Sequence, residues 1–135
     1  MALYEVVGNL HIHTPYSDGE GTHADIAKAA RLADLDFVVV TDHNVRVEGV
    51  EGYYGDDEYG YVLVLTGEEV HDQIRSPQVN HALVYADCEL SQEASDPQRL
   101  IDAVTRTNGL MFLAHPHDPA ITWMNMAGIP WVSHD

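Results

Sequence analysis

Five short apolar runs of this sequence carry histidine or carboxylate residues at or just beyond one end. The runs lie at residues 5–13, 37–41, 61–65, 81–85 and 110–114, and their β-branched and apolar composition predicts strands. Ligand sites in parallel α/β sheets lie at the carboxyl ends of the strands, so these polar ends are expected to meet. The polar residues are His11, His13, Asp42, His43, Glu68, Glu69, His81 and His115, and His81 is the one that opens its strand.

Helical segments between some of these strands favour an α/β fold with a mostly parallel sheet. Thr22 is a candidate N-cap with Asp25 three residues on, and the following helix is expected to reach about Ala33. An aspartate and a proline at 96–97 are typical of a second helix start, and Asn-Gly at 108–109 is typical of its end.

Residues 44–60 are too acidic and glycine-rich to predict regular structure. A loop of that length inside a compact domain is usually functional, so the segment is expected to form a lid or rim over the site.

The His-x-His pair of the first strand points toward metal binding. Side chains on a strand alternate, so His11 and His13 share one face and lie about 7 Å apart at Cα, close enough to share one metal. Two surface histidines on a half-exposed strand are the alternative, and the pair alone leaves both open.

The other polar residues are ambiguous one by one. Glu69 is expected on the apolar face of Leu63 and Leu65, where a carboxylate needs a partner, whereas Glu68 should point away. Asp18 alone is typical of a turn, and His43 alone is consistent with a helix cap or a core histidine. Together, these imidazoles and carboxylates form a set that suits zinc, manganese or iron.

Charge and composition narrow the function classes. Lys and Arg number 6 against 22 Asp and Glu, a net charge of -16, which repels nucleic acid and anionic membranes. A salt-adapted protein and an acidic enzyme that neutralises charge with metal both fit this balance. With one cysteine, no apolar stretch near membrane length and no signal-peptide pattern, a cytoplasmic location is expected.

Taken in order, these segments resemble the PHP family, named for polymerase and histidinol phosphatase. The forms at 67–70 and 80–83 look most like the CehA/McbA branch of metallohydrolases within it. The matching segments are 9–14 (NLHIHT), 16–19 (YSDG), 41–44 (TDHN), 67–70 (GEEV), 80–83 (NHAL) and 114–116 (AHP).

The resemblance implies a single PHP domain over residues 1–135, a distorted (β/α)7 barrel related to the TIM barrel, with about five of seven strands present. It also implies two or three divalent metals, with His11, His13 and Glu69 at the first, Glu69, His81 and His115 at the second, and Asp18 and His43 at the third. The residues carried over as catalytic are Glu69, Asp18 and His43.

One family motif, a late Asp-x-His that should complete the first and third sites, is not found. We expect a fragment, with a shortened variant or a partner that supplies the rest as alternatives. We also expect fewer tightly bound metals. Exposed edge strands would favour self-association, so a homo-oligomer is among the expected partners.

Further histidines and arginines have weaker assignments. His117 is expected in a loop, His23 at the surface, and His71 is a candidate for substrate contact. Arg46 and Arg75 are candidates for phosphate contact in segments that the sequence does not place.

The function implied by the resemblance is hydrolysis of a small or nucleotide phosphate ester by a metal-bound hydroxide. A hydrolase of another ester or a carbamate is the enzymatic alternative, and a non-catalytic metal-binding module is the other. The exonuclease module of a DNA polymerase is disfavoured by the net charge of -16 and by the lack of a basic groove.

Overall fold

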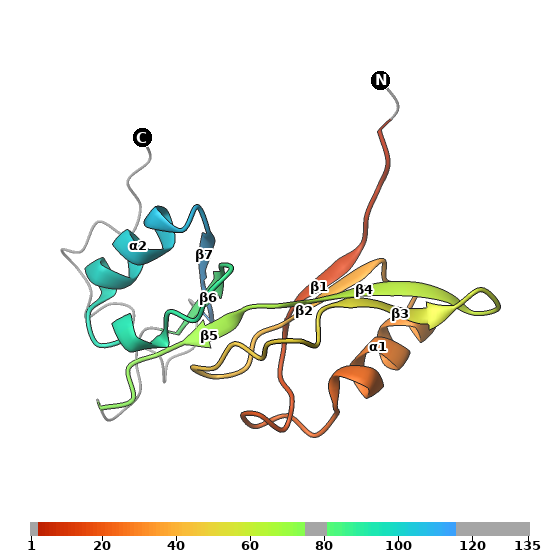
Figure 1. Ribbon diagram of the computed structural model, residues 1–135, viewed down its shortest axis with the longest axis horizontal. Coiled ribbons are helices and arrows are strands. Elements are labelled where there is room, and N and C mark those ends of the chain that lie inside the picture. Colours follow the sequence, from red (N-terminus) through yellow and green to blue (C-terminus); the bar gives the residue numbers. More distant parts are fainter. Residues whose placement is uncertain (1–2, 75–80, 116–135) are drawn as a thin grey trace.

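The computed structural model describes residues 3–74 and 81–115, which form two β-sheets with one α-helix packed on each (Figure 1). In the first sheet the strand order is β1-β2-β4-β3, and in the second it is β5-β6-β7. The strands are β1 (Gly8–Ile12), β2 (Phe37–Val40), β3 (Gly52–Asp56), β4 (Gly60–Thr66), β5 (Glu68–Val70), β6 (Ala82–Tyr85) and β7 (Leu110–Leu113).

The first sheet is parallel over β1, β2 and β4 and is covered by α1 (His23–Leu32). Its core contains Ala27 and Ala30 of the helix, Val38 and Val40 of β2, and Val62 and Val64 of β4. In β4 Val62, Val64 and Thr66 are buried, and Leu63 and Leu65 are half-buried. The helix packs on the valine face, which is opposite to the leucine face on which Glu69 was expected.

The cap predicted for α1 is confirmed. Thr22 accepts a hydrogen bond from the backbone N–H of Asp25, and the Asp25 carboxylate accepts one from the backbone of Thr22. His23, expected at the surface, is buried in the first turn, with its ring edge against Tyr16.

Part of the predicted lid is a strand. Residues 52–56 form β3, which pairs antiparallel with β4 from Gly52↔Val64 to Asp56↔Gly60. The turn between them is closed by the Asp56 carboxylate, which accepts hydrogen bonds from the N–H groups of Glu58 and Tyr59. The strand was not predicted because the segment is rich in acidic residues and glycine, although the tyrosines of β3 suit a sheet edge.

The second sheet is antiparallel throughout, so the prediction of a mostly parallel sheet holds only for the first. A short 3-10 helix, η1 (Ser91–Glu93), precedes α2 (Pro97–Arg106), which has the predicted aspartate cap and proline start. The helix packs Leu100, Ala103 and Val104 against Val70 and Val84 of the sheet.

The two sheets join where β4 runs through Gly67 into β5. The Gly67 N–H donates to the carbonyl of Val40, and a Cβ at Gly67 would lie 2.6 Å from the Val84 carbonyl oxygen, so a larger residue does not fit. A parallel bridge between His43 and Glu69 continues the contact. Over residues 3–74 and 81–115 the sheets do not close into a barrel, so the seven-stranded barrel remains a prediction.

No helix within residues 3–74 and 81–115 has both the length and the apolar character of a membrane span.

Candidate metal centre

The edge where the two sheets meet collects histidines from five chain segments. Since β5 and β6 are antiparallel, Val70 pairs with Ala82, and the start of β6 lies beside the end of β5. Since β7 is antiparallel to β6, Leu113 also pairs with Ala82. His81 before β6 and His115 after β7 therefore reach the same edge as Glu69. The one residue that broke the strand-end pattern in the sequence, His81, is explained by the direction of its strand.

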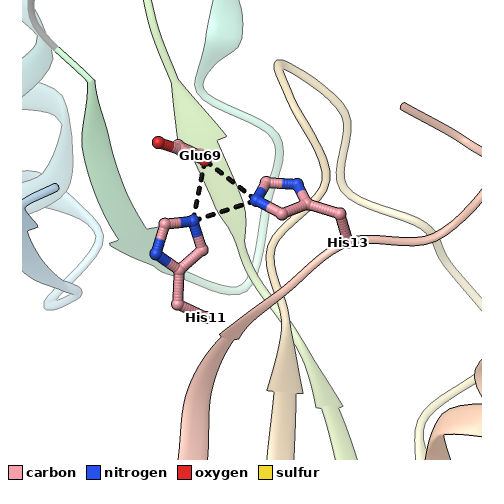
Figure 2. A group of neighbouring side chains, drawn as sticks. All are labelled: His11, His13 and Glu69. Atoms are coloured by element: carbon pink, nitrogen blue, oxygen red, sulfur yellow. Dashed lines mark hydrogen bonds and ion pairs between the residues drawn. The ribbon is translucent and has the colours of Figure 1, made fainter. Parts of the chain in front are cut away.

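Glu69 lies at the centre of this cluster and is fully buried. Its Oε2 atom lies 2.8 Å from His11 Nε2 and 3.1 Å from His13 Nε2, as Figure 2 shows. The two imidazole nitrogens are themselves 2.9 Å apart. One carboxylate oxygen and two ring nitrogens thus converge on one point.

The other oxygen of Glu69 faces a second pair of histidines. His81 Nδ1 lies 2.8 Å from Oε1, and His115 Nε2 lies 3.1 Å from the same atom. The carboxylate therefore separates two groups of rings, one on each oxygen.

A third group forms around Asp18. Its carboxylate oxygens lie 3.5 Å from His13 Nδ1 and 3.6 Å from His43 Nε2. The His13 and His43 rings stack with centroids 4.6 Å apart. Unlike Glu69, Asp18 is largely exposed, so this group lies at the rim of the cluster.

The electrostatics of the cluster favour an ionised Glu69. Burial raises the pKa of this carboxyl, but hydrogen bonds from His11, His13 and His81 outweigh burial and hold the pKa far below its usual range. The hydrogen bond to Glu69 raises the pKa of His13, whereas burial lowers the pKa of His43.

The donor set fits divalent metals. His43 Nδ1 and His81 Nε2 are fully buried and make no hydrogen bond to the described part of the chain, which is costly for an imidazole without another partner. The His11 and His13 nitrogens face each other and one oxygen, an arrangement that N–H groups satisfy poorly and a cation satisfies fully. Imidazole and carboxylate together are ligands of zinc, manganese and iron. Three residue groups could each hold an ion: His11, His13 and Glu69; His13, Asp18 and His43; and His43, Glu69 and His81.

Glu68 points away from this cluster, as the strand alternation predicted. Its carboxylate accepts a hydrogen bond of 2.6 Å from the Leu90 N–H and is buried. Burial raises the pKa of Glu68 to about 7. The two adjacent glutamates therefore occupy different environments, one among histidines and one under the loop before η1.

An open pocket of about 550 Å³ adjoins the Asp18 group, and His71 lies in its wall. The His71 ring stacks on His81 at 4.7 Å and meets His43 edge-on at 5.0 Å. Burial lowers the pKa of His71. This position agrees with the expected substrate contact of His71 without testing it. The lining residues are Ser17, Asp18, His43, Asn44, His71 and Gln73.

Sequence analysis gave no role to two residues beside the cluster. The Asn44 side chain accepts a hydrogen bond from the His71 N–H, and the Asp42 carboxylate holds the loop that carries Asp18. Their position directly after β2, next to His43, was the available signal. Arg46, a candidate for phosphate contact, forms an ion pair with Glu51 at 3.1 Å. Arg75, His117 and the end of the chain lie outside the described residues.

Fold and site together define a mixed α/β protein with a buried carboxylate–histidine cluster of metal-binding type. The sequence matches the PHP domain over residues 9–126, and the chain belongs to that family. It is 26% identical over 122 residues to Uncharacterized protein MJ1587 of Methanocaldococcus jannaschii, covering 82% of this chain and 68% of that protein. No solved structure matched the chain.

Membership of the PHP family indicates the general class of function. PHP domains bind divalent metals and are generally hydrolases of the phosphoesterase type. Placement in the CehA/McbA branch stays a prediction.

Proposed function

We propose that this protein is a metal-dependent phosphoesterase acting on small phosphate esters. The observation that carries the proposal is the placement of Glu69, a buried carboxylate with two histidine nitrogens within 3.1 Å of each oxygen. Hydrolytic centres with two metals hold them about 3.5–4 Å apart, a span that a bridging carboxylate can cover.

Each metal would be held by a different set of residues. His11 and His13 would hold one metal with Glu69 Oε2, and His81 and His115 a second with Oε1. Asp18 and His43 would hold a third at the rim. When bound, such metals would stabilise charge on phosphoryl oxygens and lower the pKa of water.

The substrate is inferred from the pocket. Among the described residues no lysine or arginine lines it, and Arg46 is paired with Glu51. With no basic side chain on this described part of the wall, phosphate charge would be neutralised chiefly by metal, which favours an ester with a single phosphate over a polyanion. The net charge of -16 also argues against nucleic acid as a substrate.

Hydrolysis of an aryl phosphate, compared with an aryl carbamate, tests the proposal. The protein is loaded separately with zinc, manganese or iron, and each activity is measured before and after chelation. We expect chelator-sensitive release of phosphate and little carbamate hydrolysis. Faster hydrolysis of the carbamate would indicate a hydrolase of another ester or a carbamate. Metal-loaded protein that hydrolyses neither substrate would favour a non-catalytic metal-binding module.

A further inference from the structure

Asp18 is a candidate metal ligand on an exposed loop, and such a ligand needs support from elsewhere. Its side chain is 67% exposed, and its contacts with His13 and His43 are 3.5 and 3.6 Å long. These contacts are too long to fix the loop by themselves. A ligand held loosely binds metal weakly, so some other group must determine where Asp18 lies.

The group that contacts this loop most closely is the carboxylate of Asp42. Its Oδ1 accepts hydrogen bonds from the Thr14 N–H at 2.7 Å and from the Ser17 hydroxyl at 2.8 Å. Its Oδ2 accepts one from the Thr14 hydroxyl at 2.6 Å. Asp42 is 1% exposed, so these bonds are shielded from water. A buried carboxylate with these short bonds holds its donors firmly.

The loop is tight enough to transmit this anchorage to Asp18. The N–H groups of Ser17 and Gly19 both donate to the Thr14 carbonyl at 3.0 Å, which closes residues 14–19 into a compact turn. A Cβ at Gly19 would lie 2.1 Å from the His13 carbonyl oxygen, so the turn returns directly against the backbone of His13. With both neighbours of Asp18 fixed, the backbone that carries its side chain is held in place.

Asp42 also connects the other two ligand-bearing segments. It directly precedes His43, and its backbone carbonyl accepts a hydrogen bond of 3.1 Å from the Glu69 N–H. The side chain therefore holds the Asp18 loop while the backbone holds the Glu69 strand.

We propose that Asp42 is a positioning residue that sets the geometry of the His13, Asp18 and His43 metal group. The inference rests on the proposed function insofar as these residues bind metal. Asp42 itself contacts neither metal nor substrate in this proposal. Its effect is on the loop, through the three hydrogen bonds.

Substitutions at Asp42 separate its hydrogen bonds from its charge. Asp42→Asn keeps both acceptor bonds of Oδ1, and its amide can donate to the Thr14 hydroxyl, which rotates to accept. Asp42→Ala removes all three bonds. Asp18→Asn is the comparison variant, because it weakens the ligand itself.

The measurement is a titration of each metal-free variant with manganese, together with its thermal melt. We expect Asp42→Ala to weaken binding of one metal about 10–100-fold and leave the other metals unchanged, as Asp18→Asn does. Asp42→Asn should stay close to wild type. Combining Asp42→Ala with Asp18→Asn should add little to either change alone, because both act on one site.

If Asp42→Ala does not fold, a Thr14→Val, Ser17→Ala double variant removes the same hydroxyl bonds from the loop side and should lose the same metal. The inference would be overturned if metal binding is unchanged in whichever of these variants folds. It would also be overturned if Asp18→Asn weakens the binding of none of the metals that the wild type holds. Metal binding is measured without turnover. A wild type that binds metal normally but hydrolyses no phosphate ester would therefore refute the proposed function alone.

Discussion

The carboxylate of Glu69 meets His81 Nδ1 through Oε1 at 2.8 Å, and this is not the oxygen that meets His11 and His13. One buried side chain thereby joins the first sheet to the second at the proposed catalytic edge. Its neighbour Glu68 is also buried, but its carboxylate accepts a hydrogen bond from the Leu90 backbone, so the adjacent pair offers a matched experiment.

Glu69→Gln should abolish hydrolysis and reduce bound metal, because an amide cannot bridge two cations as a carboxylate does. Glu68→Gln should keep most activity and metal, since its Oε1 can still accept from Leu90. Activity and metal content of both variants check this. Equal losses of activity and metal in the two variants would mean that Glu69 is not the glutamate that holds the metals.

Tyr85→Phe should weaken the connection between the sheets. The Tyr85 hydroxyl donates to the Leu10 carbonyl at 2.8 Å, one residue before His11. Burial raises the pKa of Tyr85 to about 12, so the hydroxyl keeps its proton at neutral pH. We expect a loss of about 0.5–1.5 kcal/mol in the free energy of unfolding and weaker metal binding. Denaturant unfolding with and without metal measures both, and an unchanged metal affinity would separate this contact from the site.

Thr22→Ala should cost about 1 kcal/mol in the free energy of unfolding near neutral pH, because the helix loses its cap. Thr105→Ala, an exposed helix threonine that bonds within its own helix, is the control and should cost less. Hydrogen bonds from Thr22 lower the pKa of Asp25, so the stabilisation by ionised Asp25 is present above its ordinary pKa of 3.8 and is lost as pH falls further. Denaturant unfolding of both variants across this pH range tests the assignment. An equal cost for the two variants would contradict it.

Added salt should raise the melting temperature. The net charge of -16 implies repulsion among surface carboxylates. This repulsion reaches over about 30 Å at 0.01 M salt but over only about 3 Å at 1 M salt. Thermal melts with potassium chloride, at saturating metal, measure the effect. A flat or falling melting temperature would leave a generally acidic protein without salt adaptation.

Much of the site could be predicted because its signals are local. Alternation continued just past the end of β1 places His11 and His13 together, and His43 follows the end of β2. The clustering of His81 and His115 with Glu69 was expected on the assumption of parallel strands, but it arises from antiparallel ones. Strand ends alone do not reveal strand direction.

What the sequence did not reveal depends on tertiary contacts. The β3 strand is stabilised by pairing with β4 and not by its own composition, which is why an acidic, glycine-rich segment forms it. The role of Asp42 depends on a loop 25–28 residues earlier in the chain. Both faces of β4 are apolar in sequence, and only the packing of α1 distinguishes the valine face, which the helix covers, from the leucine face.

The number of metal ions that remain bound per chain after exhaustive dialysis tests the central claim most directly. Elemental analysis of the manganese- or zinc-loaded wild type should find two firmly held ions, one on each oxygen of Glu69. The ion of the exposed Asp18 group should be lost first. Glu69→Gln, prepared in parallel, should retain at most one. A wild type that retains no metal, or a Glu69→Gln variant that retains as much as wild type, would contradict the account.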